Sequence, residues 1–166
     1  MSYTPAQAKA IADYLLADFE NETAATKRVI GAIPAGKETY APDAKNMTAL
    51  DLAWHIARSE AFFLNSVAEG KFVRSNSERP GNLRSPQDIL AWYDTNVIPA
   101  LTRAKSLSGD QLAQIVDFFG VAQMPLVNCL LFMVKHGAHH RGQLSAYLRP
   151  MGAKVPAIYG QSADTK

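Results

Sequence analysis

The stretch 125–149, PLVNCLLFMVKHGAHHRGQLSAYLR, is the most apolar part of the chain and decides the fold. Its apolar residues recur at intervals of three and four, which is the period of a helix rather than of a strand. Pro150 and Gly152 follow directly and prevent the helix from continuing. The spacing predicts one helix of about 25 residues whose apolar face must be covered by other elements.

Three more helices are predicted, over 5–33, 48–69 and 86–107. Their start signals are capping residues, followed in two cases by proline at the first helical position, and the second helix has a glycine stop: Thr4-Pro5, Thr48-Ala-Leu-Asp51, Ser85-Pro86-Gln-Asp88 and Gly70. Pro99 lies inside the third helix, where we expect a kink or a break because proline has no backbone donor. The connector 108–124 is open between a short helix and an extended segment.

The four helices would cover well over half of the chain, and no alternating strand pattern has comparable strength. We therefore predict an all-α fold, and within that class a four-helix bundle, because each apolar face can be buried against its neighbours. Connections of roughly 15 residues allow an up-down-down-up order as well as a simple up-and-down one, and we expect a long crossover connection. The expected domain is a single one over 1–166, with an ordered tail from about 150.

Composition narrows the functional classes. The 166 residues are 48% apolar and 19% charged, as in a globular protein, and 17 Lys+Arg against 15 Asp+Glu are scattered along the chain. The sequence has no stripe of basic residues of the kind that binds nucleic acid. No secretory signal or membrane-spanning run is apparent. The single cysteine, Cys129, cannot form an intramolecular disulfide, which favours a cytoplasmic location.

Histidines carry the chemistry of this sequence. His136 and His140 are four residues apart, so on a helix both imidazoles can meet one metal ion. They share a face with apolar residues that must point into the bundle: Leu126, Cys129, Phe132 or Met133, Leu144 and Tyr147. His55 lies on the inward face of the second helix and can supply a third ligand, as facing helices do in bundle metal sites. The alternative is that these are core histidines bonded to carbonyl groups.

Other polar residues near the histidines have weaker claims. His139 points away from the His136/His140 face and is expected beside the site or at the surface. Cys129 lies about 10.5 Å along the helix from His136, which is too far for one coordination sphere. Gln143 could bond a ligand or lie on a helix flank, and Asp51 could orient His55 or serve only as a cap. No catalytic residue is identified, and the aromatic residues are expected in the core: Trp54, Phe62, Phe63, Trp92 and Tyr93.

Three segments together resemble the DinB/YfiT-like family: LDLAWHIA at 50–57, HGAHHRGQLSAYLRPMG at 136–152, and VPAIYGQSAD at 155–164, which is similar to the tail of the damage-inducible branch. The resemblance implies a four-helix bundle that binds one divalent metal ion per chain through His55, His136 and His140, usually in a homodimer. Three imidazoles suit zinc or nickel, and also iron or cobalt. The resemblance further implies that Arg141 and Gly142 belong to the family pattern.

Relatives with a known activity use low-molecular-weight thiols such as bacillithiol or mycothiol. The resemblance therefore implies a metal-dependent S-transferase acting on a small-molecule substrate in stress response or detoxification. A metal-dependent hydrolase using activated water is one alternative. Another is a non-catalytic metal-binding module of the stress response. Neither nucleic acid nor a membrane is expected as a partner.

Overall fold

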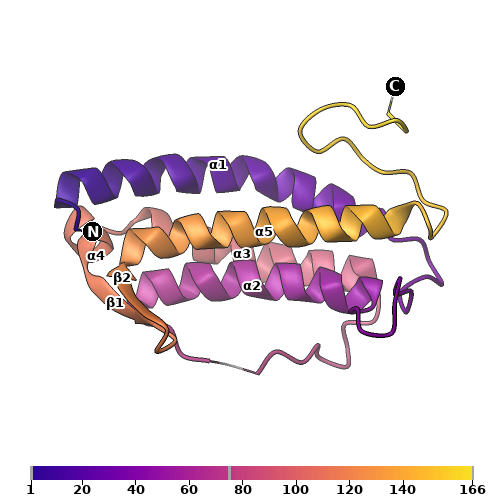
Figure 1. Ribbon diagram of the computed structural model, residues 1–166, viewed down its shortest axis with the longest axis horizontal. Helices are drawn as coiled ribbons and strands as arrows, with labels where there is room; N and C mark the ends of the chain where they lie inside the picture. Colours follow the sequence, from indigo (N-terminus) through magenta and orange to yellow (C-terminus); the bar gives the residue numbers. More distant parts are fainter. Residues whose placement is uncertain (1, 75, 166) are drawn as a thin grey trace.

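The four predicted helices are present in the computed structural model, which describes residues 2–74 and 76–165 (Figure 1). The elements, in chain order, are α1 (Pro5–Gly31), α2 (Ala49–Glu69), α3 (Pro86–Lys105), α4 (Gly109–Ala113), β1 (Ile115–Phe118), β2 (Ala122–Pro125) and α5 (Leu126–Leu148). The ends of the long helices lie within about two residues of those expected, as is usual for helix termini. The all-α bundle is confirmed.

The capping residues act as predicted. Thr4 and Ser85 each form a capping box with the residue three positions later, and Thr48 accepts a hydrogen bond from the backbone of Asp51. Gly70 ends α2 in the left-handed conformation, at φ 67°, which costs glycine little because it has no Cβ. These side chains satisfy backbone groups that a helix end would otherwise leave without partners.

The third helix does not break at Pro99. α3 runs through it without interruption, because Val97, Ala100 and Leu101 on either side are buried in the core and hold the turn in place. Packing of the flanking residues thus outweighs the loss of one backbone hydrogen bond. The expectation of a break was wrong.

The connector that the sequence left open contains both of its alternatives. Ser108 caps the short helix α4, and β1 then pairs with β2 in an antiparallel hairpin. The turn places Phe119 and Gly120 at positive φ, 58° and 74°. Four-residue strands are too short to show an alternating pattern in the sequence. The hairpin packs near the first turns of α5 (Figure 1).

The helices are arranged up-down-down-up (Figure 1). α1 packs on α3 and α5, and α2 also packs on α3 and α5, so α1 and α2 occupy opposite corners of the bundle. α2 and α3 are neighbours that run in the same direction. The connection 70–85 must therefore return along the whole bundle, and it is the long crossover that we expected.

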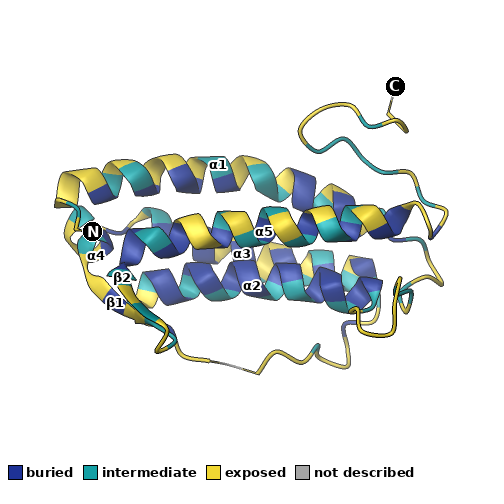
Figure 2. Cartoon of the chain, viewed as in Figure 1, coloured by how far each residue is buried: buried dark blue, intermediate teal, exposed yellow. Residues whose placement is uncertain are grey.

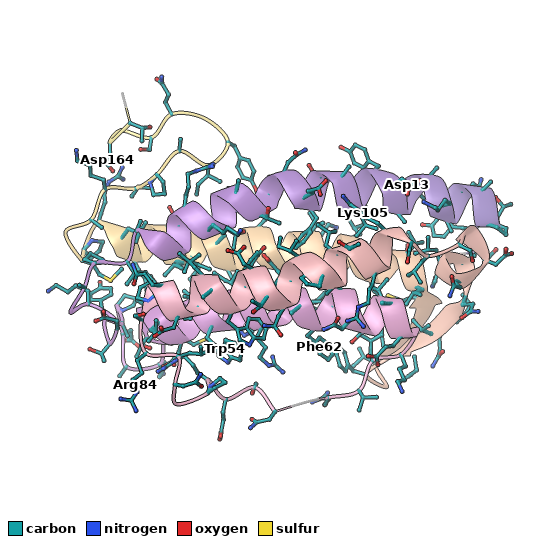
Figure 3. The ribbon with its side chains drawn as sticks, turned by 180° about the vertical axis from the view of Figure 1, so that it is seen from behind. Asp13, Trp54, Phe62, Arg84, Lys105 and Asp164 are labelled. Carbon is teal, nitrogen blue, oxygen red and sulfur yellow. The ribbon has the colours of Figure 1, made fainter. Side chains whose placement is uncertain are left out.

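This crossover lies against α2. The Trp54 indole donates to the backbone oxygen of Ser77 at 3.1 Å, and the Arg58 guanidinium donates to that of Asn76, also at 3.1 Å. Further along, Arg79 pairs with Asp51 at 2.8 Å. The crossover therefore covers the side of α2 from which Trp54 and Phe62 extend (Figure 3).

The inward faces of the four long helices form one continuous core (Figure 2). Among the described residues, it also encloses the side chains of an acidic and a basic residue, Glu60 and Arg141, each only 2% exposed. The Tyr93 hydroxyl donates to the Glu60 carboxyl group. Burial raises the pKa of Glu60 to about 7.

The C-terminal tail folds back against α1. Arg141 pairs with Glu22 of α1, and the Tyr159 hydroxyl in the tail also donates to Glu22, at 2.9 Å. Arg28 donates to the backbone oxygen of Ala157.

In the described part of the chain, no helix combines the length and the apolar character needed to cross a bilayer.

Candidate metal centre

Two neighbouring helices supply the three histidines. His55 lies in the second turn of α2, and His136 and His140 lie on successive turns of α5, which packs against α2. All three side chains are half-buried. The structure therefore brings together the three residues that the sequence singled out, and their role as metal ligands remains a prediction.

The imidazoles form a compact group. The Nε2 atoms of His55 and His136 are 3.2 Å apart, and His140 lies beside both, with ring centroids at 4.4 Å from each. One nitrogen from each of the three rings lies within 4.8 Å of the others.

These distances fit one metal ion. Two nitrogen ligands of a tetrahedral zinc ion with Zn–N bonds of 2.0–2.1 Å are about 3.4 Å apart. The separation of 3.2 Å between the His55 and His136 nitrogens is close to that value. Without a cation, this contact needs a proton on one of the two nitrogens. With a cation, both lone pairs have a partner.

The electrostatic surroundings keep the histidines neutral. Burial, with smaller contributions from the nearby His140 and Arg58, lowers the pKa of His55 to about 4. Burial and the neighbouring histidines likewise lower the pKa of His136 to about 4, and burial lowers that of His140. Neutral imidazole is the form that binds metals. At neutral pH the three rings are therefore ready to donate their lone pairs.

Gln143 orients His140. Its side-chain oxygen lies 3.0 Å from His140 Nδ1, and its nitrogen donates to the Tyr147 hydroxyl at 3.2 Å. Asn46 donates to the same hydroxyl at 3.1 Å. Because the Gln143 oxygen can only accept, His140 Nδ1 carries the proton and Nε2 keeps its lone pair toward the other histidines.

The remaining candidates lie outside the cluster. Asp51 bonds Thr48 and Arg79, so its carboxylate is engaged in the cap and the crossover. Cys129 is fully buried in the core, and burial raises its thiol pKa to about 11, so it does not supply a thiolate. His139 is exposed. Of the roles considered for each residue, these placements agree with a cap for Asp51, core packing for Cys129 and a surface position for His139.

Aromatic side chains lie beside the histidines. The expectation that the aromatic residues are buried in the core was partly wrong. Met133 is buried, whereas its neighbour Phe132 is 46% exposed. Trp54, Phe63 and Tyr93 are core residues as expected, but Phe62 and Trp92 are only half-buried.

Two pockets open at the cluster. One, of about 380 Å³, includes Phe62, Phe132 and His136 in its lining. The other, of about 510 Å³, includes His55 and Arg79. Both volumes are in the range of small-molecule sites. Phe132 precedes His136 by one helical turn. That spacing is the signal that could have identified Phe132 as a residue of the pocket beside His136.

Comparison with known proteins identifies the family. The family model described as "DinB family" matches residues 5–165. The chain belongs to the DinB family. A protein of Bacillus subtilis named as the uncharacterised protein YrdA is 27% identical over 153 residues, covering 92% of this DinB chain and 90% of that protein.

Solved DinB-like structures share the fold. A DinB-like protein from Bacillus subtilis, YjoA, superimposes with a TM-score of 0.71 at 21% identity, covering 89% of this chain and 99% of that one. A DinB-like protein from Bacillus cereus gives a TM-score of 0.70 at 26% identity, covering 87% and 95%. The bundle is thus the family's architecture.

Proposed function

We propose that this DinB protein is a metal-dependent enzyme in which His55, His136 and His140 hold one divalent cation and a small thiol is transferred to an electrophile. The observation that supports this best is a cluster of three imidazoles, of which His136 lines one pocket and His55 another. A structural metal site is usually closed by four protein ligands, whereas a catalytic one keeps a position open. In the described residues the cluster has three such ligands.

The cation would supply a positive charge that favours the thiolate form of a thiol at neutral pH. The protein's own residues prepare the site. Burial of His55 and His136 keeps both rings neutral, so that one nitrogen of each retains its lone pair, and Gln143 fixes the tautomer of His140. Phe63 and Phe132 lie beside the His136 ring, at centroid distances of 5.8 and 6.1 Å, and exclude water from one side.

The thiol must come from outside the chain. Cys129 is the protein's single cysteine, and it is buried seven positions before His136 on α5, away from the cluster. A small thiol entering one of the pockets is therefore the nucleophile in this proposal. Zinc and nickel are the expected cations, because three imidazoles suit both.

Metal content and cobalt spectroscopy test the proposal together. Tag-free wild-type protein, purified without a nickel column, is compared with His136→Ala and with the control His139→Ala, which changes an exposed histidine on the same helix. We expect one metal ion per chain in the wild type and the control, and none in His136→Ala. The cobalt form titrated with small thiols should then develop a thiolate charge-transfer band.

Either step can contradict the proposal. If His136→Ala retains metal as the wild type does, the histidines are not the ligands. If cobalt binds but no thiol tested changes its spectrum, the proposal of thiol transfer is wrong. Assays of hydrolysis and of stability without metal then separate the hydrolase from a non-catalytic metal-binding module.

A further inference from the structure

The 380 Å³ pocket beside His136 has a composition that selects a particular ligand. Four phenylalanines line it together with two arginines: Phe62, Phe63, Phe119, Phe132, Arg58 and Arg74. They come from α2, the crossover, the hairpin turn and α5, four separate parts of the chain. The pocket is thus an assembled apolar site with positive charge at its border.

The aromatic walls favour a flat apolar group. The Phe62 and Phe119 rings are stacked with an interplanar angle of 16° and centroids 5.8 Å apart. Phe132 stands at the mouth of the pocket and is 46% exposed, although it contacts Phe63 and Phe118. A large aromatic side chain left half in water beside a pocket offers its ring to a ligand. An aromatic group is the best match, because it can pack against the partly exposed ring of Phe132.

The two arginines give the pocket its charge preference. The Arg58 guanidinium lies 5.9 Å from the Phe62 ring centroid, and that of Arg74 lies 5.6 Å from the Phe119 centroid. An arginine lying over a ring keeps its N–H groups in the guanidinium plane, where they can donate to an anion. The described lining of this pocket contains no carboxylate.

The neighbouring pocket provides an internal comparison. Its lining also includes Arg58, with Arg79 as a second arginine, but Asp51 and Glu78 are present as well. Arg79 is paired with Asp51. The described lining of the 510 Å³ pocket therefore carries charges of both signs, whereas that of the 380 Å³ pocket includes arginines and no carboxylate.

We propose that the pocket formed by Phe62, Phe119, Phe132, Arg58 and Arg74 binds an aromatic anion, with the ring on the phenylalanines and the anionic group at the arginines. The identification of this anion as the electrophilic substrate rests on the proposed function, because His136 lies in the same pocket. Its binding does not require that function.

Binding of two matched probes tests the proposal. Naphthalene-2-sulfonate carries an aromatic ring and a sulfonate, which is a poor metal ligand, and 2-(methylsulfonyl)naphthalene is its neutral counterpart. Wild-type protein should bind the sulfonate about tenfold more tightly than the neutral probe, as expected for one charge-assisted contact. Arg74→Gln should remove most of this preference, whereas Arg84→Gln, an exposed arginine elsewhere on the crossover, should keep it. Phe132→Ala should weaken both probes.

The His140→Ala variant separates this proposal from the metal proposal. His140 does not line the 380 Å³ pocket, so the variant disturbs the cluster and leaves the described lining in place. It should bind the sulfonate as the wild type does. Equal affinity of the wild type for the two probes, or an unchanged preference in Arg74→Gln, would overturn the aromatic-anion site. Absence of thiol chemistry in the wild type, with sulfonate binding retained, would overturn only the enzyme proposal.

Discussion

Substituting Gly137 tests whether the buried carboxyl group of Glu60 is held rigidly beside helix α5. A Cβ atom at position 137 would lie 3.0 Å from Glu60 Oε1, which is closer than ordinary van der Waals contact. Glu60 is 2% exposed and is bonded to Tyr93, which is fully buried. The carboxyl group therefore has little room to move away.

Gly142 on the same helix is a matched control. A Cβ atom added there meets nothing within 4 Å, and the residue is exposed. Both substitutions to alanine gain about 1 kcal/mol of helix propensity. Only Gly137→Ala also forces an extra carbon into a packed core, which typically costs about 1–3 kcal/mol. Gly142→Ala should thus be more stable than the wild type by about 1 kcal/mol, and Gly137→Ala less stable than Gly142→Ala by about 1–3 kcal/mol.

Urea unfolding followed by circular dichroism measures both free energies of unfolding. For a chain of this size the difference corresponds to roughly 2–12 °C in melting temperature. A double variant, Gly137→Ala with Glu60→Ala, should recover the cost of the contact beyond the sum of the single changes. If Gly137→Ala and Gly142→Ala are equally stable, Glu60 moves aside freely and the reasoning from this contact fails.

Three further predictions concern protons and ligand orientation. Burial raises the Glu60 pKa from 4.5 to about 7, so the folded state holds a proton that the unfolded chain releases. The contribution of Glu60 to stability therefore falls as the pH rises from 4.5 to 7. Urea unfolding at several pH values should show Glu60→Gln gaining up to about 3 kcal/mol of stability relative to the wild type over that range. Because the pKa of both His55 and His136 is about 4, protons compete little with a metal ion for these nitrogens. Metal affinity measured by chelator competition should therefore change little between pH 8 and 6. A fall in metal affinity that begins near pH 6.5 would contradict this. Gln143→Ala should weaken metal binding about 10- to 100-fold by releasing His140, with unchanged affinity as the contrary result.

Local signals were sufficient for the helices and for the His136/His140 pair, whereas the addition of His55 rested on its inward face and on the family resemblance. Thr4, Ser85 and Gly70 fix helix ends through hydrogen bonds and backbone conformation that involve residues only a few positions away. The spacing of His136 and His140 likewise depends on the geometry of a single helix. Such features depend on nearby residues, so the sequence reveals them.

Features that depend on distant partners were not predictable in the same way. Helical periodicity left Phe132 and Met133 as alternatives, and only the position of the hairpin and the pocket leaves Phe132 partly exposed. Asp51 bonds Arg79, a residue of the crossover whose position no local pattern specifies. The contact from Gln143 to His140 spans one helical turn and was within reach of the sequence.

The crossover 70–85 lets the shape of the 380 Å³ pocket vary independently of the histidine cluster. The α2 helix has 21 residues and is about 31 Å long, and an extended chain needs only about ten residues to cover that distance. The segment therefore has slack. Changes in its length or sequence near Arg74 can reshape the pocket while the helices keep the three histidines in register. One scaffold of this kind can present pockets of different shape by altering a single loop.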